Sequence, residues 1–223
     1  MRSVLFWREV AMRFPIIRES VRAGGQERQA YVYTVTEAEY MEKFRQEDNR
    51  THLLRFSEKV RHCKVDIFEK FAHGTIAVPA AGDPDRNGQG RYIRFYMDGE
   101  KLILIGETSW TEKMLDGIFD EDGFQITDTA QAFFAFLDVL IAGEGEYIDD
   151  WEEGLNQWES KMLENDRSIP EGFEQYMQRT RRALLQAYRY YDQMGDMAQM
   201  FAESPCDMID KRSRRLFKFL SDR

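Results

Sequence analysis

The fold is decided by the stretch from residue 173 to residue 201, which reads FEQYMQRTRRALLQAYRYYDQMGDMAQMF. Apolar or small residues recur there at alternating intervals of four and three residues. This is the heptad pattern of a helix that pairs with another helix along one stripe. The predicted stripe consists of Phe173, Met177, Thr180, Leu184, Ala187, Tyr191, Met194, Ala198 and Phe201.

The segment before it repeats the pattern, with one polar member, Glu144. We predict a single helix over residues 128–165, roughly 57 Å long at 1.5 Å per residue. Pro170 and Gly172 lie between the two stripes and indicate a helix-to-helix connection, so the two helices should form an antiparallel hairpin. The second stripe consists of Leu137, Ile141, Glu144, Ile148, Trp151, Leu155, Trp158 and Met162.

Working outward, the first 126 residues show shorter elements. Thr36 and Glu39 have the spacing of a capping box, which predicts a helix through about residue 46. Asp98-Gly99 between two apolar runs predicts a β-hairpin. Further predicted strands cover 14–19, 30–35 and 64–71, a second apolar run covers 74–81 and ends at a loop, and a helix covers 111–119.

We therefore predict an α/β fold: a mixed sheet with flanking helices, followed by a long antiparallel helix hairpin and the start of a stalk helix. The predicted domains are residues 1–126, 127–204 and 205–223. Ser204-Pro205 ends the hairpin, and a third helix begins near Asp207. It has no stop signal before Arg223, so we interpret the chain as part of a longer protein.

Composition excludes several classes of function. The chain of 223 residues has 31 basic and 40 acidic residues, for a net charge of −9. Such a charge disfavours binding to nucleic acid or to an anionic membrane. Cys63 and Cys206 are too few for a disulfide framework or a four-ligand zinc site. Neither a signal peptide nor an apolar run of membrane-spanning length is present, so we expect a soluble, cytoplasmic chain.

Catalytic patterns are weak. The histidines, His52, His62 and His73, are too far apart for a short metal-binding motif, and no paired nucleophile and base is evident. We therefore do not expect an enzyme. The glycine-rich loop 82–90 lacks the P-loop ending; it is either a plain connection or a contact for a hard cation through Asp83 or Asp85.

Charge also separates along the chain. The segment 144–166 is strongly acidic, which indicates a solvated face or a surface that attracts cations. The tail 207–223 is basic. We expect this tail to meet the acidic hairpin of its own or a neighbouring subunit.

In this order the segments resemble the cytoplasmic part of CorA-type magnesium transporters. The resemblance covers about residues 60–223 and depends on the ordered combination rather than on any single motif. The similar stretches are Val65–Phe71, Thr129–Asp138, Ile148–Leu155, Arg179–Ala202 and Phe217–Arg223.

The resemblance implies a homopentamer in which Mg²⁺ bound between subunits regulates the gate. The family's loop aspartate corresponds to Asp83 or Asp85, and its stalk aspartate to Asp222. The family's Gly-Met-Asn loop and two membrane helices lie beyond the residues of this chain, so the chain alone is not expected to conduct ions. It would act at the cytoplasmic face of the cell membrane, joined to the membrane only through those helices. Some relatives move zinc or other divalent cations.

A second interpretation is a stand-alone α/β domain whose coiled-coil arm binds a protein partner. It requires no divalent cation. A third, a soluble enzyme that uses the loop 82–90, has no supporting pair of catalytic residues.

Overall fold

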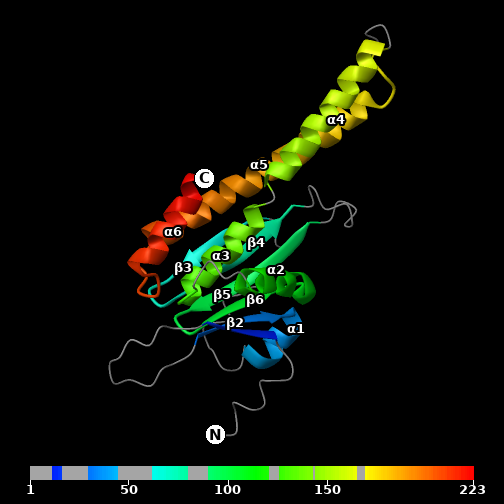
Figure 1. The fold of residues 1–223 in the computed structure, drawn as a ribbon. Coiled ribbons are helices and arrows are strands. Elements are labelled where there is room, and N and C mark those ends of the chain that lie inside the picture. The colour runs from blue at the N-terminus through cyan, green and yellow to red at the C-terminus, as the bar shows by residue number, and fades with distance from the viewer. Residues whose placement is uncertain are drawn as a thin grey trace, which may run out of the picture.

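The computed structural model describes residues 12–16, 30–44, 62–79, 90–120, 126–142, 144–164 and 169–223 (Figure 1). The strands are β1 Met12–Ile16, β2 Ala30–Val35, β3 Lys64–Ile67, β4 Phe71–Val78, β5 Arg91–Asp98 and β6 Lys101–Ile105. The helices are α1 Glu37–Glu39, the π-helix η2 Tyr40–Phe44, α2 Thr108–Asp120, α3 Thr129–Ile141, α4 Glu144–Glu164, α5 Phe173–Glu203 and α6 Lys211–Asp222.

The strands form one mixed sheet in the order β1-β2-β6-β5-β4-β3. All neighbours are antiparallel except β2 and β6, which are parallel. The predicted Asp98-Gly99 hairpin is confirmed, with Asp98 Oδ1 accepting from the backbone nitrogens of Glu100 and Lys101. The predicted strand 64–71 is wrong as a single element, because the chain turns at residues 68–70 and β4 begins at Phe71.

The two faces of the sheet are covered differently. One face carries the main hydrophobic core and is covered by α2, α3, α5 and α6. The other carries a smaller cluster built on Tyr40, Phe44 and Tyr96 beneath α1 and η2. The capping box at Thr36 and Glu39 is confirmed. The buried guanidinium of Arg94 pairs with Glu37 and joins β5 to α1.

The predicted helix 128–165 is two helices. α3 ends at Ile141 and lies on the sheet, whereas α4 begins at Glu144 and projects away with the upper part of α5 (Figure 1). The sequence has glycines at 143 and 145. Glycine destabilises the interior of a helix because its backbone loses more conformational entropy on folding than that of any other residue. The predicted hairpin is therefore formed by α4 and α5, and α3 belongs to the sheet layer.

The main core contains buried residues from both sides of the predicted boundary at residue 127. Phe95 of the sheet, Phe133 of α3, Phe201 of α5 and Phe217 of α6 lie in the same cluster. The boundary thus marks a change of secondary structure within one core, and the division into domains stays a prediction. Among the described residues, no helix is both long and apolar enough to cross a membrane.

Candidate functional site

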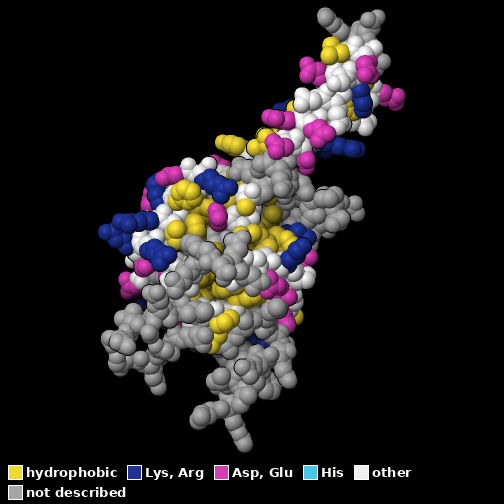
Figure 2. Space-filling view, in the orientation of Figure 1, with side chains coloured by type: hydrophobic (Ala, Val, Ile, Leu, Met, Phe, Trp, Pro, Cys, Tyr) yellow, Lys and Arg dark blue, Asp and Glu magenta, His cyan; other side chains and the backbone are white. Residues whose placement is uncertain are grey.

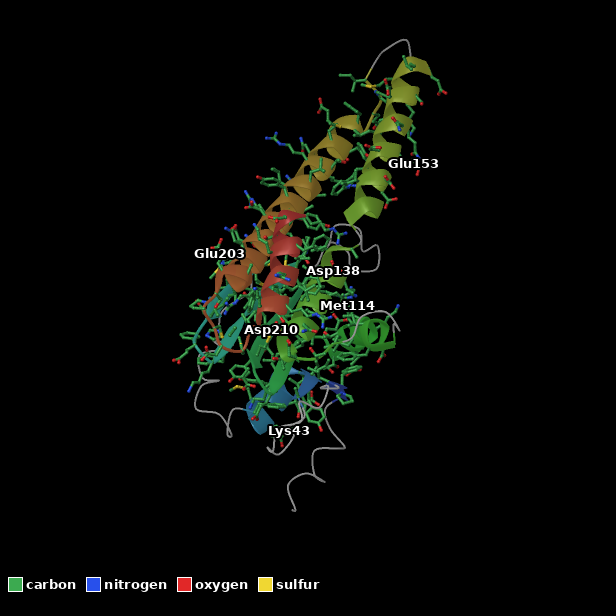
Figure 3. The ribbon with its side chains drawn as sticks, turned by 60° about the vertical axis from the view of Figure 1, so that its left-hand side comes forward. Lys43, Met114, Asp138, Glu153, Glu203 and Asp210 are labelled. Carbon is green, nitrogen blue, oxygen red and sulfur yellow. The ribbon has the colours of Figure 1, made fainter. Side chains whose placement is uncertain are left out.

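The candidate site is the junction of α3, α5 and α6, because α6 carries Asp222, which is the predicted metal ligand that the structure describes. α6 is held by its apolar side. Phe217 is fully buried, and its ring centroid lies 4.8 Å from that of Phe201, 6.0 Å from Phe134 and 6.5 Å from Phe133. These ring contacts hold α6 against α5 and α3. Figure 3 shows Asp210 at the beginning of α6 and Asp138 on α3.

The beginning of α6 is joined to the beginning of α3 through their N-cap carboxylates. Asp210 accepts a hydrogen bond from the backbone nitrogen of Ser213 at 2.6 Å. Asp128 accepts one from the backbone nitrogen of Gln131 at 2.8 Å, and Ser213 Oγ lies 3.5 Å from Asp128 Oδ2. Burial favours the neutral form of Asp128, and the charge of Asp210 adds to this effect, so the pKa of Asp128 is raised.

The pKa of Asp210 moves in the opposite direction. Burial alone would raise it, but hydrogen bonds from Ser213 and Arg212 and the charge of Arg212 outweigh burial, so the pKa is lowered. The two neighbouring N-caps therefore differ in their affinity for a proton, and ionised Asp210 caps α6. The contact between Ser213 and Asp128 was not predicted from the sequence, because the two residues lie far apart in the chain.

Asp222 lies at the other end of α6. Its side chain is 61% exposed, and its Oδ1 lies 2.7 Å from Nζ of Lys218, one turn earlier. The carboxylate raises the pKa of Lys218 by accepting its hydrogen bond and through its charge. A carboxylate at a helix C-terminus faces the negative end of the helix dipole, so Lys218 offsets an unfavourable position.

A cavity of about 280 Å³ lies beside this end of α6. Arg223 lines it and also donates to Asp138 Oδ1 of α3 at 3.0 Å. The basic tail therefore meets α3 and α5 of its own subunit. The cavity has an apolar part formed by Ile141, Tyr191, Met194 and Leu220 and a polar part formed by Asp192, Asp196, Gln199, Ser221 and Arg223.

Of the three predicted metal ligands, Asp222 lies within the described residues. Asp83 and Asp85 lie outside them. In the part of the chain that is described, no group of three or more His, Cys, Asp or Glu side chains is placed to hold a metal ion. Carboxylate oxygens suit Mg²⁺, which takes six oxygen ligands. Asp222 fits such an ion only as one ligand of a site completed by other groups.

The surroundings of Cys63, Cys206 and His73 favour the uncharged form of each side chain. Burial raises the pKa of Cys63 to about 11 and also raises that of Cys206, so both remain thiols at neutral pH. Burial lowers the pKa of His73, although Asp66 at 4.0 Å favours its charged form. A reactive cysteine needs a lowered pKa, which neither thiol has.

The arm of α4 and α5 is thin and only partly buries its apolar residues. Trp158 packs on Phe173 and Tyr176, with ring centroids 5.7 and 5.6 Å apart. Tyr176 fills the space beside Gly154, where a Cβ would lie 3.1 Å from the Tyr176 ring. The predicted stripe of α5 is wrong at Met177 and Leu184, which are exposed. The residues just before them, Tyr176 and Ala183, are half-buried and face inward instead.

The structure has close counterparts of known fold. No family model matches the sequence, and no curated protein matches it. The soluble domain of CorA from Methanocaldococcus jannaschii matches with a TM-score of 0.71 at 13% identity, over 95% of this chain and 86% of that chain. This chain has the fold of the CorA soluble domain.

Two further structures share the fold. The ZntB cytoplasmic domain from Vibrio parahaemolyticus matches with a TM-score of 0.63 at 12% identity, over 96% of this chain and 90% of that chain. The full-length CmaX protein matches with a TM-score of 0.68 at 12% identity over 92% of this chain. The chain spans 64% of the length of CmaX. These likenesses confirm the predicted fold class.

Proposed function

We propose that this chain is the regulatory domain of a CorA-like transporter of divalent cations and acts at the cytoplasmic face of the membrane. The observation that carries the proposal is the shared fold over 95% of this chain with the soluble domain of CorA. On this proposal the role of the chain is to sense the cation rather than to conduct it.

The sensing step follows from the chemistry of carboxylates. Asp222 is exposed at the end of a helix whose other face is anchored in the core. A divalent cation shared with carboxylates of a neighbouring copy, Asp83 or Asp85, would relieve their mutual repulsion and hold the copies together. Loss of the cation would restore the repulsion and let the copies separate. In this proposal the assembly is a homopentamer, and Mg²⁺ is the weak regulatory ligand.

The test is thermal unfolding and oligomeric state as Mg²⁺ is varied, with Na⁺ at matched ionic strength. At ten times its Kd the ion should stabilise the bound form by about 1.4 kcal/mol. For a chain of this size that is a shift of roughly 3–6 °C. Asp222→Asn should abolish the shift, whereas Asp207→Asn, at an exposed carboxylate that precedes α6, should retain it.

A Mg²⁺-dependent shift that survives Asp222→Asn would refute the role of Asp222. No response to Mg²⁺ in a stable oligomer would refute cation sensing altogether.

The second candidate function is a protein-interaction module. It is favoured by one observation: the arm exposes large apolar side chains, including Leu184 at 44% and Tyr188 at 70%. If the arm only binds a protein partner, the thermal unfolding and oligomeric state of the chain should be the same with and without Mg²⁺.

A further inference from the structure

The cavity beside the end of α6 is a separate feature from the proposed cation site, because Asp222 does not line it. α5 forms one wall, the last residues of α6 form the other, and Ile141 at the end of α3 also lines the space. The two long helices run side by side here (Figure 1). The cavity volume of about 280 Å³ is that of a small site, since small-molecule sites occupy about 300–1,000 Å³. The cavity therefore suits a small organic molecule.

The apolar part of the cavity is built from the core itself. Met194, Leu220 and Ile141 are 2%, 5% and 6% exposed and belong to the main hydrophobic core. Tyr191 packs against this core, with its ring centroid 5.2 Å from that of Tyr190. Because the core holds these side chains in place, the apolar surface is formed before a ligand arrives, as in most small-molecule sites.

Gly195 is at the centre of the α5 wall. Asp192 lies about one turn before it and Gln199 about one turn after it, and all three line the cavity. Glycine destabilises the interior of a helix, and Gly195 is inside α5. A Cβ at this position would meet no neighbouring atom within 4 Å, so no close approach requires a glycine. The missing side chain instead leaves the cavity open, and a larger residue would extend into it.

The α5 wall of the cavity is acidic. Asp192 and Asp196 are four residues apart, line the cavity and are exposed. Within the described part of the chain neither has an ion pair, whereas Arg223, the basic residue of the lining, pairs with Asp138 at 3.0 Å. Like charges at this spacing on a helix repel each other. Basic side chains gather over α6 in Figure 2, so a bound cationic group would lie on the α5 side.

These properties select the chemical class of the ligand. A metal ion would leave the apolar part of the cavity uncovered, and in the region that the structure describes no three ligating side chains are placed to hold one. A primary ammonium group has three N–H donors and can reach both carboxylates. A cavity of about 150 Å³ accepts benzene, so this cavity has room for about ten non-hydrogen atoms. A small amine with a compact apolar body fits both parts of the lining.

We propose that this cavity binds a primary amine with a short apolar body. The ammonium group donates hydrogen bonds to Asp192 and Asp196, and the apolar body covers Met194, Tyr191 and Leu220. A primary alkylamine has a pKa of about 10, as lysine has, and is therefore protonated at neutral pH. The binding requires neither a divalent cation nor a second copy of the chain, so it goes beyond the proposed function.

The test follows the methyl group of Met194 by NMR in the full chain, labelled with ¹³C at the methionine methyls; Met194→Leu identifies the signal. The probe is 2-phenylethylamine in EDTA at constant ionic strength, titrated to about 10 mM, at which a site with a millimolar Kd is mostly occupied. The ring of the bound probe should shift the Met194 signal with a Kd on the order of 0.1–1 mM, as for a ligand of about ten atoms. The neutral analogue 2-phenylethanol keeps the ring but should bind about tenfold more weakly, because hydrogen bonds between charged groups are lost.

Two variants test the two parts of the site. Asp192→Asn with Asp196→Asn should weaken binding of the amine by about tenfold or more and leave the weak binding of the alcohol unchanged. Gly195→Leu should abolish binding of both probes, because the leucine side chain fills the cavity.

Each variant has a matched control. Asp149→Asn with Glu153→Gln removes the same charge at the same spacing from exposed positions of α4 and should leave binding unchanged. Gly117→Leu places the same side chain in open space on α2 and should also leave binding unchanged. Circular dichroism of each variant establishes that it is folded.

A Met194 signal that stays in place at the highest amine concentration would overturn the proposal. So would equal affinities for the amine and the alcohol, or a Gly195→Leu chain that binds the amine as the native chain does. Native affinity in the variant that lacks both carboxylates would overturn it as well. A thermal response to Mg²⁺ without any response to the amine would overturn this proposal while supporting the cation-sensing function.

Discussion

Replacement of Phe217 by alanine should release α6 from the core. Phe217 has no exposed surface and touches three other phenylalanine rings. Truncation of a buried phenylalanine to alanine costs about 3–5 kcal/mol. The three ring contacts place Phe217 toward the upper end, since each aromatic pair adds to simple burial. The lost packing energy weakens the attachment of α6 to the core, and α6 carries Asp222.

Hydrogen exchange measures this loss directly. Amides of α6 in Phe217→Ala should exchange on the order of 10³–10⁴-fold faster, because 1.36 kcal/mol corresponds to a factor of ten. Trypsin should also cut α6 sooner, since the helix is rich in lysine and arginine.

The matched control is Phe219→Ala. Phe219 is two residues further along the same helix and 64% exposed. It should change exchange in α6 by less than about threefold, as a typical surface substitution does. Equal effects of the two variants, or unchanged exchange in Phe217→Ala, would refute the reasoning that the four-ring cluster holds α6.

Three further predictions concern the core and its pH dependence. The pKa of Asp128 is raised, so its ionised form costs stability, and this cost appears as the pH rises above 3.8, the ordinary value of the group. In denaturant titrations Asp128→Asn, which keeps the N-cap, should therefore gain stability relative to the native chain as the pH rises above that value. Asp128→Ala should lose about 1 kcal/mol of capping. Gly74→Ala should lower the free energy of unfolding by at least about 1–3 kcal/mol, because a Cβ would collide with the Lys64 carbonyl oxygen. Gly117→Ala, which has open space around it, should raise the free energy of unfolding by about 0.5–1 kcal/mol. Equal effects of the two variants would contradict this explanation. Cys63, whose pKa is raised to about 11, should resist a thiol-specific reagent at pH 8 in the native chain and react at once in urea; rapid native labelling would contradict its burial.

Local chemistry made much of the fold predictable. The Asp98-Gly99 hairpin and the Thr36 capping box depend on residues within a few positions of one another, and both are present. The long helix α5 was also predictable, because its heptad pattern is uninterrupted between Gly172 and Ser204. The predicted fold class, a mixed sheet with flanking and long helices, is confirmed on the same grounds.

The candidate site was less predictable. Asp222 was singled out by resemblance, and its ion pair with Lys218 is local enough to read from their spacing of four residues. Two contacts each join residues 85 positions apart in the chain, so no local sequence pattern predicts them. They are the contact between Asp128 and Ser213 and the ion pair between Asp138 and Arg223. Asp83 and Asp85 stay predictions.

The sequence by itself determined the elements whose causes are local: turns, caps, and the periodic apolar side of each helix. Only the tertiary structure decided which apolar residues find partners. α3 and α4 carry one continuous stripe in the sequence, but α3 packs on the sheet and α4 does not. On α5, Tyr176 rather than Met177 faces inward, because Gly154 leaves room for a ring. Periodicity gives the side of a helix to within one position, whereas the shapes of the partner side chains decide its final rotation.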